Sequence, residues 1–210
     1  MAGRALITGF EPFGRHALNP SEQLALALEG KRVGGFAVSG RVLPVVFAGL
    51  GQRIETLLDD VRPDLVIALG LAPGEAEIRL ERFAVNLADA EIPDNAGAEP
   101  REQPIVGGGA VAFAASLPLR AVARALGDSG IKVRLSNSAG TFLCNAALYH
   151  LLATIERRRR NIPCGFIHLP DLPEQAAAGA PAMEFALMER ALHLALAACG
   201  EEMARSDPRS

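Results

Sequence analysis

Short apolar runs alternate with amphipathic runs along almost the whole chain. The apolar runs have the length and composition of buried strands, as in Ala5 to Thr8, Leu65 to Leu69 and Cys164 to His168. Between them, apolar side chains recur at helical spacing. Clear examples are Leu50/Ile54/Leu57/Leu58, Leu119/Val122/Ala123/Leu126 and Leu148/Leu151/Leu152/Ile155. This alternation predicts an α/β domain with a largely parallel, mixed sheet.

Other local signals complete the predicted order of elements. Asn19-Pro20-Ser21-Glu22 has the cap, first-turn proline and acid of a helix start. The remaining expected elements are an extended Phe36 to Val46, an apolar Ile78 to Leu87, a strand Ile131 to Leu135 and a helix from about Pro181 to Cys199. Residues 201–210 read as a frayed tail, and no interdomain linker stands out. We therefore expect residues 1–210 to form a single catalytic domain.

Composition narrows the classes of function. Half of the 210 residues are apolar, the net charge is −3, and there is no Trp and one Tyr. This composition is ordinary for a soluble globular protein and argues against nucleic acid or a membrane as partner. The N-terminal run is too short for a signal peptide, and Cys144, Cys164 and Cys199 fit no disulfide framework. We expect a cytoplasmic protein.

The stretch Ser136 to Asn145 carries the strongest chemical signal. Small polar residues there join a β-branched run to the amphipathic run Ala146 to Ile155, which puts Cys144 at a helix start. The positive end of the helix dipole favours an anion, and such positions lower the pKa of a cysteine. Cys144 is therefore predicted to be a nucleophile, whereas Cys164 reads as a small core residue.

A nucleophilic cysteine requires a base and a group that orients the base. Of the four histidines, His168 ends an apolar strand and should emerge at the carboxyl edge of the sheet, unlike His16, His150 and His193. No pair of histidines has metal-ligand spacing, which argues against a zinc site. Glu81 is an acid amid apolar neighbours, although an ordinary ion pair with Arg79 or Arg82 would also explain it. Spacing makes a triad of Cys144, His168 and Glu81 plausible.

Three other segments leave alternatives open. The loop Gly9 to Gly14 carries Phe10 and Phe13, which could plug the core or wall a binding pocket. Residues 88–103 are acidic and rich in Pro, Asn and Gly, and could form a flexible excursion or a lid. The run Arg157 to Arg160 could suggest RNA, but cations at a helix C-terminus complement its dipole, which favours a solvated role.

Together these motifs resemble pyroglutamyl peptidase I, also called pyrrolidone-carboxylate peptidase, a family of cysteine peptidases. The resemblance spans nearly the whole chain, in order. It rests on Thr8-Gly9-Phe10-Glu11-Pro12-Phe13-Gly14, Asn19-Pro20-Ser21, Ile92-Pro93-Asp94-Asn95, Ser136 to Asn145, Phe166-Ile167-His168-Leu169-Pro170 and Leu172-Pro173-Glu174-Gln175.

The resemblance implies a reaction, a fold and a site. The family's nucleophile, base and acid fall on Cys144, His168 and Glu81, and its pocket on Phe10, Phe13, Phe142 and Leu143. The implied reaction removes an N-terminal pyroglutamyl residue from peptides through a thioester. Also implied are a three-layer α/β/α sandwich, no cofactor or metal, a cytoplasmic location and a homo-oligomer, either a dimer or, often, a homotetramer.

The chain departs from the family pattern in two loops. Leu71 stands where the family usually has glutamine, and Glu75 and Glu91 stand where it usually has arginine. These changes keep two alternatives open. One is a cysteine amidohydrolase of altered specificity, and the other is a non-catalytic homologue that binds a lactam-like ligand.

Overall fold

The computed structural model describes residues 3–206 and contains a mixed seven-stranded sheet. β1, β3, β4 and β9 run parallel, β5 is antiparallel to β9, and β8 pairs in parallel with β5. The strands in spatial order are β2 (Arg32–Val33), β3 (Phe36–Leu43), β1 (Gly3–Phe10), β4 (Leu65–Leu71), β9 (Cys164–Leu169), β5 (Ile78–Glu81) and β8 (Val133–Ser136). A second sheet pairs β6 (Phe83–Val85) with β7 (Ala112–Ala114).

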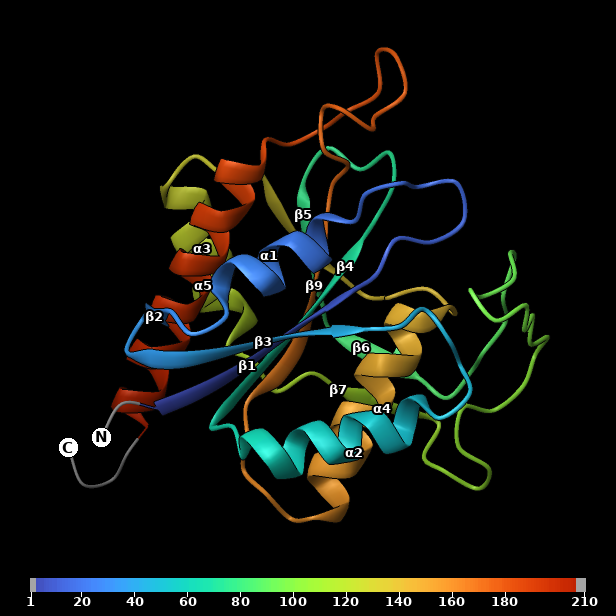
Figure 1. Ribbon diagram of the computed structural model, residues 1–210. Coiled ribbons are helices and arrows are strands. Elements are labelled where there is room, and N and C mark those ends of the chain that lie inside the picture. The colour runs from blue at the N-terminus through green and yellow to red at the C-terminus, as the bar shows by residue number, and fades with distance from the viewer. Residues whose placement is uncertain (1–2, 207–210) are drawn as a thin grey trace.

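In the described part of the chain, five helices cover the two faces of the sheet, which makes a three-layer sandwich (Figure 1). One face carries α1 (Pro20–Leu28), α3 (Leu119–Asp128) and α5 (Phe185–Arg205), and the other carries α2 (Leu50–Val61) and α4 (Leu143–Arg157). The strand period of two divides the core accordingly. Ile7 and Ile67 join the cluster under α1 and α5, whereas their neighbours Leu6 and Val66 pack under α2 and α4.

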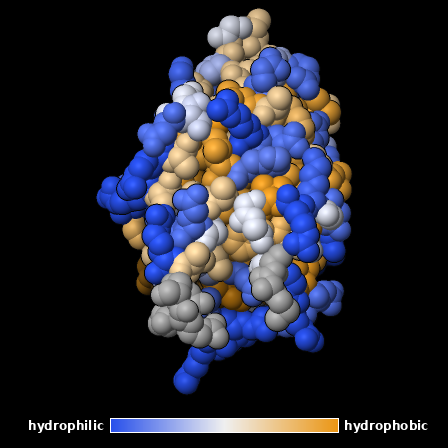
Figure 2. Space-filling model, turned by 90° about the vertical axis from the view of Figure 1, so that its left-hand side faces the viewer, coloured by the Kyte–Doolittle hydropathy of each residue, from blue (hydrophilic) through white to orange (hydrophobic). Residues whose placement is uncertain are grey.

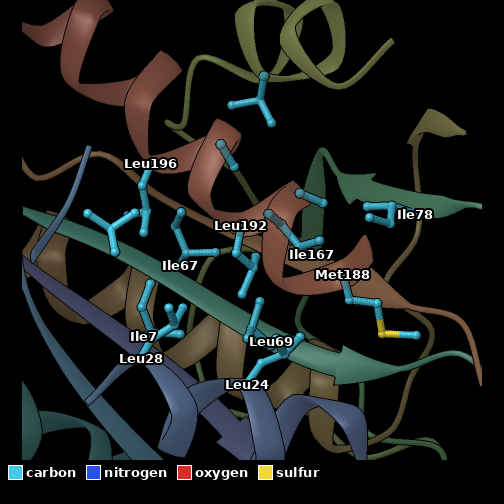
Figure 3. Packing of buried hydrophobic residues seen from close by; sticks show 14 of the residues in the cluster. Ile7, Leu24, Leu28, Ile67, Leu69, Ile78, Ile167, Met188, Leu192 and Leu196 are labelled. Carbon is cyan, nitrogen blue, oxygen red and sulfur yellow. The ribbon is translucent and has the colours of Figure 1, made fainter. Parts of the chain in front are cut away.

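The central strand β4 is buried along its whole length, as expected for a parallel strand with helices on both sides. Its Ile67 and Leu69 belong to the same buried cluster as Leu192 and Leu196 of α5, and Figure 3 shows these side chains between the sheet and the helix. Burial of such side chains contributes about 1.5–3 kcal/mol each. The sheet is therefore a rigid platform for whatever its strand ends carry.

The predicted fold class is confirmed, and most predicted elements lie where the pattern placed them. Asn19 caps α1, because its side chain accepts a hydrogen bond from the backbone N–H of Ser21. The apolar run Ile78 to Leu87 divides into β5 and β6, which belong to different sheets. Neither β2 nor β7 was predicted, since both are too short to show a period.

The prediction for the C-terminal segment is wrong. The final helix begins at Phe185, later than expected, and continues through Gly200 to Arg205. Gly200 is therefore a packing residue inside the helix and not its end. It lies against the backbone oxygen of Gly34, where a side chain would not fit. The tail expected at 201–210 is thus helical to Arg205, and residues 207–210 lie outside the described part of the chain.

The outer surface is mixed in character. Figure 2 looks onto the side of the molecule that lies at the left of Figure 1, where α5 and β2 lie, and shows apolar side chains in the middle of that face with hydrophilic ones around them. Among residues 3–206, no helix is both long enough and apolar enough to cross a lipid bilayer.

Candidate active site

One row of directly paired residues across the sheet, which we call the rung, brings together residues from three strands. His168 of β9 is paired with Gly70 of β4 on one side and with Arg79 of β5 on the other. Glu81, two residues beyond Arg79 on β5, is paired with Phe166. Directly paired residues point to the same face of a sheet, so these side chains share a face. It is the face covered by α4, since Phe166 packs in the cluster under that helix.

Cys144 is in the first turn of α4 and reaches down onto this rung. Gly140, with φ of +79°, makes the turn before the helix, and Phe142 is the N-cap residue. A Cβ placed on Gly70 would lie 2.7 Å from the Sγ of Cys144. The thiol therefore lies over Gly70, and the paired His168 is on the adjacent strand, about 4.8 Å away across the sheet.

His168 and Glu81 form a buried hydrogen-bonded pair. The Nδ1 of His168 is 2.8 Å from the Oε1 of Glu81, and both side chains are almost wholly buried. A carboxylate can only accept, so Nδ1 carries the proton and donates it to Glu81. This arrangement leaves Nε2 as the ring nitrogen with a free lone pair. Of the two possible partners for Glu81, the structure selects Arg79 at 3.1 Å, whereas Arg82 bonds Asn137.

The electrostatics differ from the expectation for Cys144. Burial and, to a smaller extent, the charge of Glu81 raise the pKa of Cys144, Arg79 opposes them, and the net result is a pKa of about 12. The expected lowering of this pKa at a helix start is therefore wrong, because desolvation outweighs the effect of the helix. Burial also lowers the pKa of His168, although its hydrogen bond to Glu81 acts in the opposite direction. Both shifts favour a neutral thiol beside a neutral imidazole.

Two side chains fasten the segment around Cys144 to the rest of the protein. Thr141 donates from Oγ1 to the backbone oxygen of Asp89 at 2.7 Å, and the backbone N–H of Asp89 donates back to the oxygen of Thr141. Asn145 is fully buried and makes three hydrogen bonds, two with the backbone of Val85 and one to the oxygen of Leu87. The start of α4 is thus held in a fixed position.

A small pocket adjoins the thiol. The four residues that the resemblance assigned to a pocket all line it, together with Cys144 itself. Its lining consists of Phe10, Phe13, Asn19, Val45, Leu71, Phe142, Leu143 and Cys144. The ring of Phe142 stands 6.0 Å from that of Phe13 and edge-on to Phe47 at 5.4 Å. Sequence reasoning missed Asn19 and Val45, whose signals were those of a helix cap and a strand end.

The three departures from the family pattern lie in different surroundings. Leu71 is buried and lines the pocket. Glu75 lies away from the pocket and forms ion pairs with Arg79 and Arg134. Glu91 is exposed and directly precedes Ile92. Ile92 lies beside the aromatic loop, since its Cδ1 would be 3.4 Å from a Cβ on Gly14.

The segment 88–103 is fastened at several points rather than free. Its two ends pair at Ala88 and Gln103. In its middle, Asp94 accepts hydrogen bonds from the backbone of Phe47, Ala96 and Ala98. Asn95 donates to Glu11 at 2.7 Å. These contacts favour a fixed wall beside the aromatic loop over a flexible excursion.

The remaining candidates are not among the residues that line the pocket beside the thiol. The ring of His16 is tilted against that of Phe13, its Nδ1 is 3.9 Å from the Oδ1 of Asp171, and His150 packs against Gly51. Arg157 and Arg158 pair with Glu55 and Asp59 of α2. Cys164 and Cys199 are buried. Within residues 3–206, no three His, Cys, Asp or Glu side chains gather as a metal-binding group would require.

Comparison with known proteins gives one consistent result. A family model described as pyroglutamyl peptidase matches residues 3–202. The chain is 44% identical over 193 residues to pyrrolidone-carboxylate peptidase 2 of Photorhabdus laumondii, covering 91% of this chain and 88% of that protein. It is 42% identical to the pyrrolidone-carboxylate peptidase of Yersinia pestis, covering 92% and 91%. The solved structure of pyrrolidone carboxyl peptidase from Thermococcus litoralis superposes with a TM-score of 0.93 at 38% identity, over 97% of this chain and 96% of that one.

Proposed function

The chain belongs to the pyroglutamyl peptidase family of cysteine peptidases, and on that premise we propose that it removes an N-terminal pyroglutamyl residue from peptides through Cys144, His168 and Glu81. The observation that carries the proposal is the thiol of Cys144 over Gly70, in the same rung as a histidine that is bonded to a buried carboxylate. We also propose that residues 1–210 act as one catalytic domain.

The first half of the reaction forms a thioester. The Nε2 of His168 takes the thiol proton as the sulfur of Cys144 attacks the carbonyl carbon of the pyroglutamyl residue. Glu81 stabilises the imidazolium that forms, since its carboxylate already accepts from Nδ1. The imidazolium then gives its proton to the leaving amine, and the C–N bond breaks. Such acid–base assistance contributes about 10²–10⁴-fold in rate.

The second half releases pyroglutamate. His168 takes a proton from water, the hydroxide attacks the thioester carbon, the C–S bond breaks, and the imidazolium returns its proton to the sulfur of Cys144. In both halves the carbonyl oxygen gains negative charge. The first backbone N–H groups of α4 have no partner within the helix and stand beside the thiol, so they can stabilise this oxyanion.

The pocket fits the substrate class. A pyroglutamyl ring is a small, uncharged lactam, and the pocket beside Cys144 is small and lined mainly by apolar side chains. Phe10, Phe13, Phe142 and Leu143 would contact the ring. Among the lining residues Asn19 alone carries a side-chain amide, but this amide already bonds Glu11 and Ser21. Backbone groups would therefore recognise the lactam.

We propose further that the enzyme works in the cytoplasm as a homo-oligomer, a dimer or a tetramer. A free thiol at Cys144 requires reducing conditions, and all three cysteines are free. The apolar patch of Figure 2 offers a surface that a second copy could cover. Light scattering coupled to size-exclusion chromatography tests the assembly, and a monomer at micromolar concentration would rule it out.

The main test is hydrolysis of a fluorogenic pyroglutamyl amide. The wild-type protein should release the fluorophore and free pyroglutamate, and Cys144→Ala should abolish both. Cys164→Ala is the matched control, because it removes a buried cysteine from β9 without touching the thiol over Gly70. No turnover by the wild-type protein at high enzyme concentration would overturn the proposal.

The same assay separates the alternative of altered specificity, which the buried Leu71 in the pocket favours. In that case other N-acyl amides would turn over faster than the pyroglutamyl amide, and iodoacetamide would still label Cys144. Glu91→Arg restores the charge that the family usually carries at this position. Unchanged kinetics in that variant would remove Glu91 from the question of specificity.

A further inference from the structure

Arg79 lies closer to the reaction centre than its sequence context suggested. It shares the rung of His168 and faces the same side of the sheet. Its side chain is only 18% exposed. One of its terminal nitrogens, Nη2, is 3.1 Å from the Oε1 of Glu81, the same oxygen that accepts from His168.

Glu81 depends on this contact. Its side chain has no exposed surface, and its second oxygen, Oε2, is buried without a hydrogen-bond partner. Within residues 3–206, its ion pairs are with Arg79 and His168. A buried carboxylate is costly unless it is paired. Because His168 is neutral at rest, Arg79 supplies the permanent positive charge.

The same guanidinium also holds the segment that leads to Cys144. Nη2 donates to the backbone oxygen of Ser138 at 2.7 Å and lies 3.3 Å from the Oγ of Ser136. Ser136 ends β8, and Ser138 lies in the connection from β8 to α4. One side chain therefore links the acid of the triad to the loop that presents the nucleophile.

Glu75 holds the other end of Arg79. Its Oε1 is 3.2 Å from Nη1 of Arg79 and 3.1 Å from Nη2 of Arg134. An arginine at this position, as the family usually has, would place a like charge beside Arg79. Glu75 is therefore the complement of Arg79 rather than an isolated charge reversal.

We propose that Arg79 is a positioning residue that fixes Glu81 against His168 and ties it to the Cys144 loop, with Glu75 as its counter-ion. This inference rests on the proposed function. It concerns a contact between β5 and the loop after β8, and not a residue that touches substrate.

The charges around the thiol support this role. Burial and Glu81 raise the pKa of Cys144, and Arg79 lowers it. Burial and Arg79 lower the pKa of His168, whereas Glu81 and Glu75 raise it. The charged and titratable groups that face the pair are therefore Glu81, Arg79 and Glu75. Arg79 is the only one of the three that favours a thiolate at Cys144.

The experiment uses Arg79→Gln and Arg79→Lys in the full chain, with thermal denaturation to confirm folding. Arg79→Gln should lower kcat by about 10- to 100-fold, as expected when hydrogen bonds to a charged group are lost, and leave KM within about threefold. The rate of Cys144 alkylation by iodoacetamide at pH 8 should fall as well. Arg79→Lys keeps the charge but not the fork of donors, so it should restore alkylation and only part of kcat.

Glu75→Arg is the second variant. It moves the sequence toward the family pattern, yet it should lower kcat as Arg79→Gln does, because it displaces Arg79. Arg134→Gln is its control, since it removes the other partner of Glu75. Arg82→Gln is the control for Arg79, because Arg82 bonds Asn137 of the same loop and points to solvent. Both controls should behave as wild type.

The outcomes separate the two proposals. Wild-type kcat and alkylation in folded Arg79→Gln, or full activity in Glu75→Arg, would overturn the positioning role. If the wild-type protein fails to hydrolyse pyroglutamyl amides, the proposed function fails. The alkylation rates of Cys144 still test Arg79 in that case, because they require no substrate.

Discussion

Gly70→Ala tests whether the thiol lies where the rung places it. The added methyl would stand 2.7 Å from the Sγ of Cys144 and 2.8 Å from the ring of Phe166. Ordinary contacts of a Cβ begin at about 3.4 Å, so the thiol and the ring must each retreat by roughly 0.6–0.7 Å. The fully buried ring of Phe166 can retreat only by disturbing its neighbours, whereas the thiol can rotate. The substitution should therefore displace the nucleophile.

The expected cost appears in two measurements. Overpacking should lower the free energy of unfolding by about 1–3 kcal/mol, measured by urea denaturation. A displacement of that size at the reacting atom should lower kcat/KM on a pyroglutamyl amide by about 10²-fold.

Gly165→Ala is the matched control for this substitution. It lies on the neighbouring strand β9, and its methyl would meet the side chain of Leu117 at 2.5 Å, with no contact to Cys144. It should lose stability but keep the activity of the folded fraction. If Gly70→Ala is as active as wild type when folded, the thiol does not lie over Gly70 and the reasoning is refuted.

Three further predictions concern the acid, the helix start and pH. Glu81→Gln should lower kcat by about 10²–10⁴-fold, because His168 loses the carboxylate that fixes its tautomer, and a loss below threefold in steady-state assays would contradict the role. Asn145→Ala removes the three hydrogen bonds of a buried side chain and should lower the free energy of unfolding, measured in urea, by about 3 kcal/mol. A loss of less than about 1 kcal/mol would contradict this prediction. Burial raises the pKa of Cys199 to about 12, above its unfolded value of about 8.5. The contribution of this thiol to the free energy of unfolding is therefore complete below pH 8.5 and declines as the pH rises toward 12. Urea titrations up to pH 10.5 should then show a flatter decline for Cys199→Ala, and identical slopes would contradict the prediction.

Local sequence patterns predicted the fold well because each long element carries its own period. The helix face at Leu119, Val122 and Leu126 is visible without any tertiary information, and the structure forms α3 there. The two-residue strand β2 shows no period at all. It exists because the chain turns back and pairs Arg32 with Ala37, which is a property of the turn.

The site was predictable only in part, since strand order decides it. Cys144, His168 and Glu81 were each suggested by local context. That β9 lies between β4 and β5 cannot be read from spacing, and this order alone places Gly70 and Arg79 on either side of His168. Arg79 was visible only as one of two possible partners for Glu81. The sign of the pKa shift at Cys144 was missed because a helix start suggests a charged thiol, whereas burial opposes one.

The neutral resting pair changes how the triad should be understood. A thiol with a raised pKa beside an imidazole with a lowered one holds little thiolate before substrate arrives. In the proposed reaction, proton transfer from the thiol to His168 therefore accompanies the attack of the sulfur on the carbonyl. At that moment the hydrogen bond between Glu81 and His168 becomes strongest, because the carboxylate faces a newly formed cation at 2.8 Å. Arg79 already holds the buried carboxylate of Glu81 at 3.1 Å, so the partner of that cation is in position before the transition state requires it.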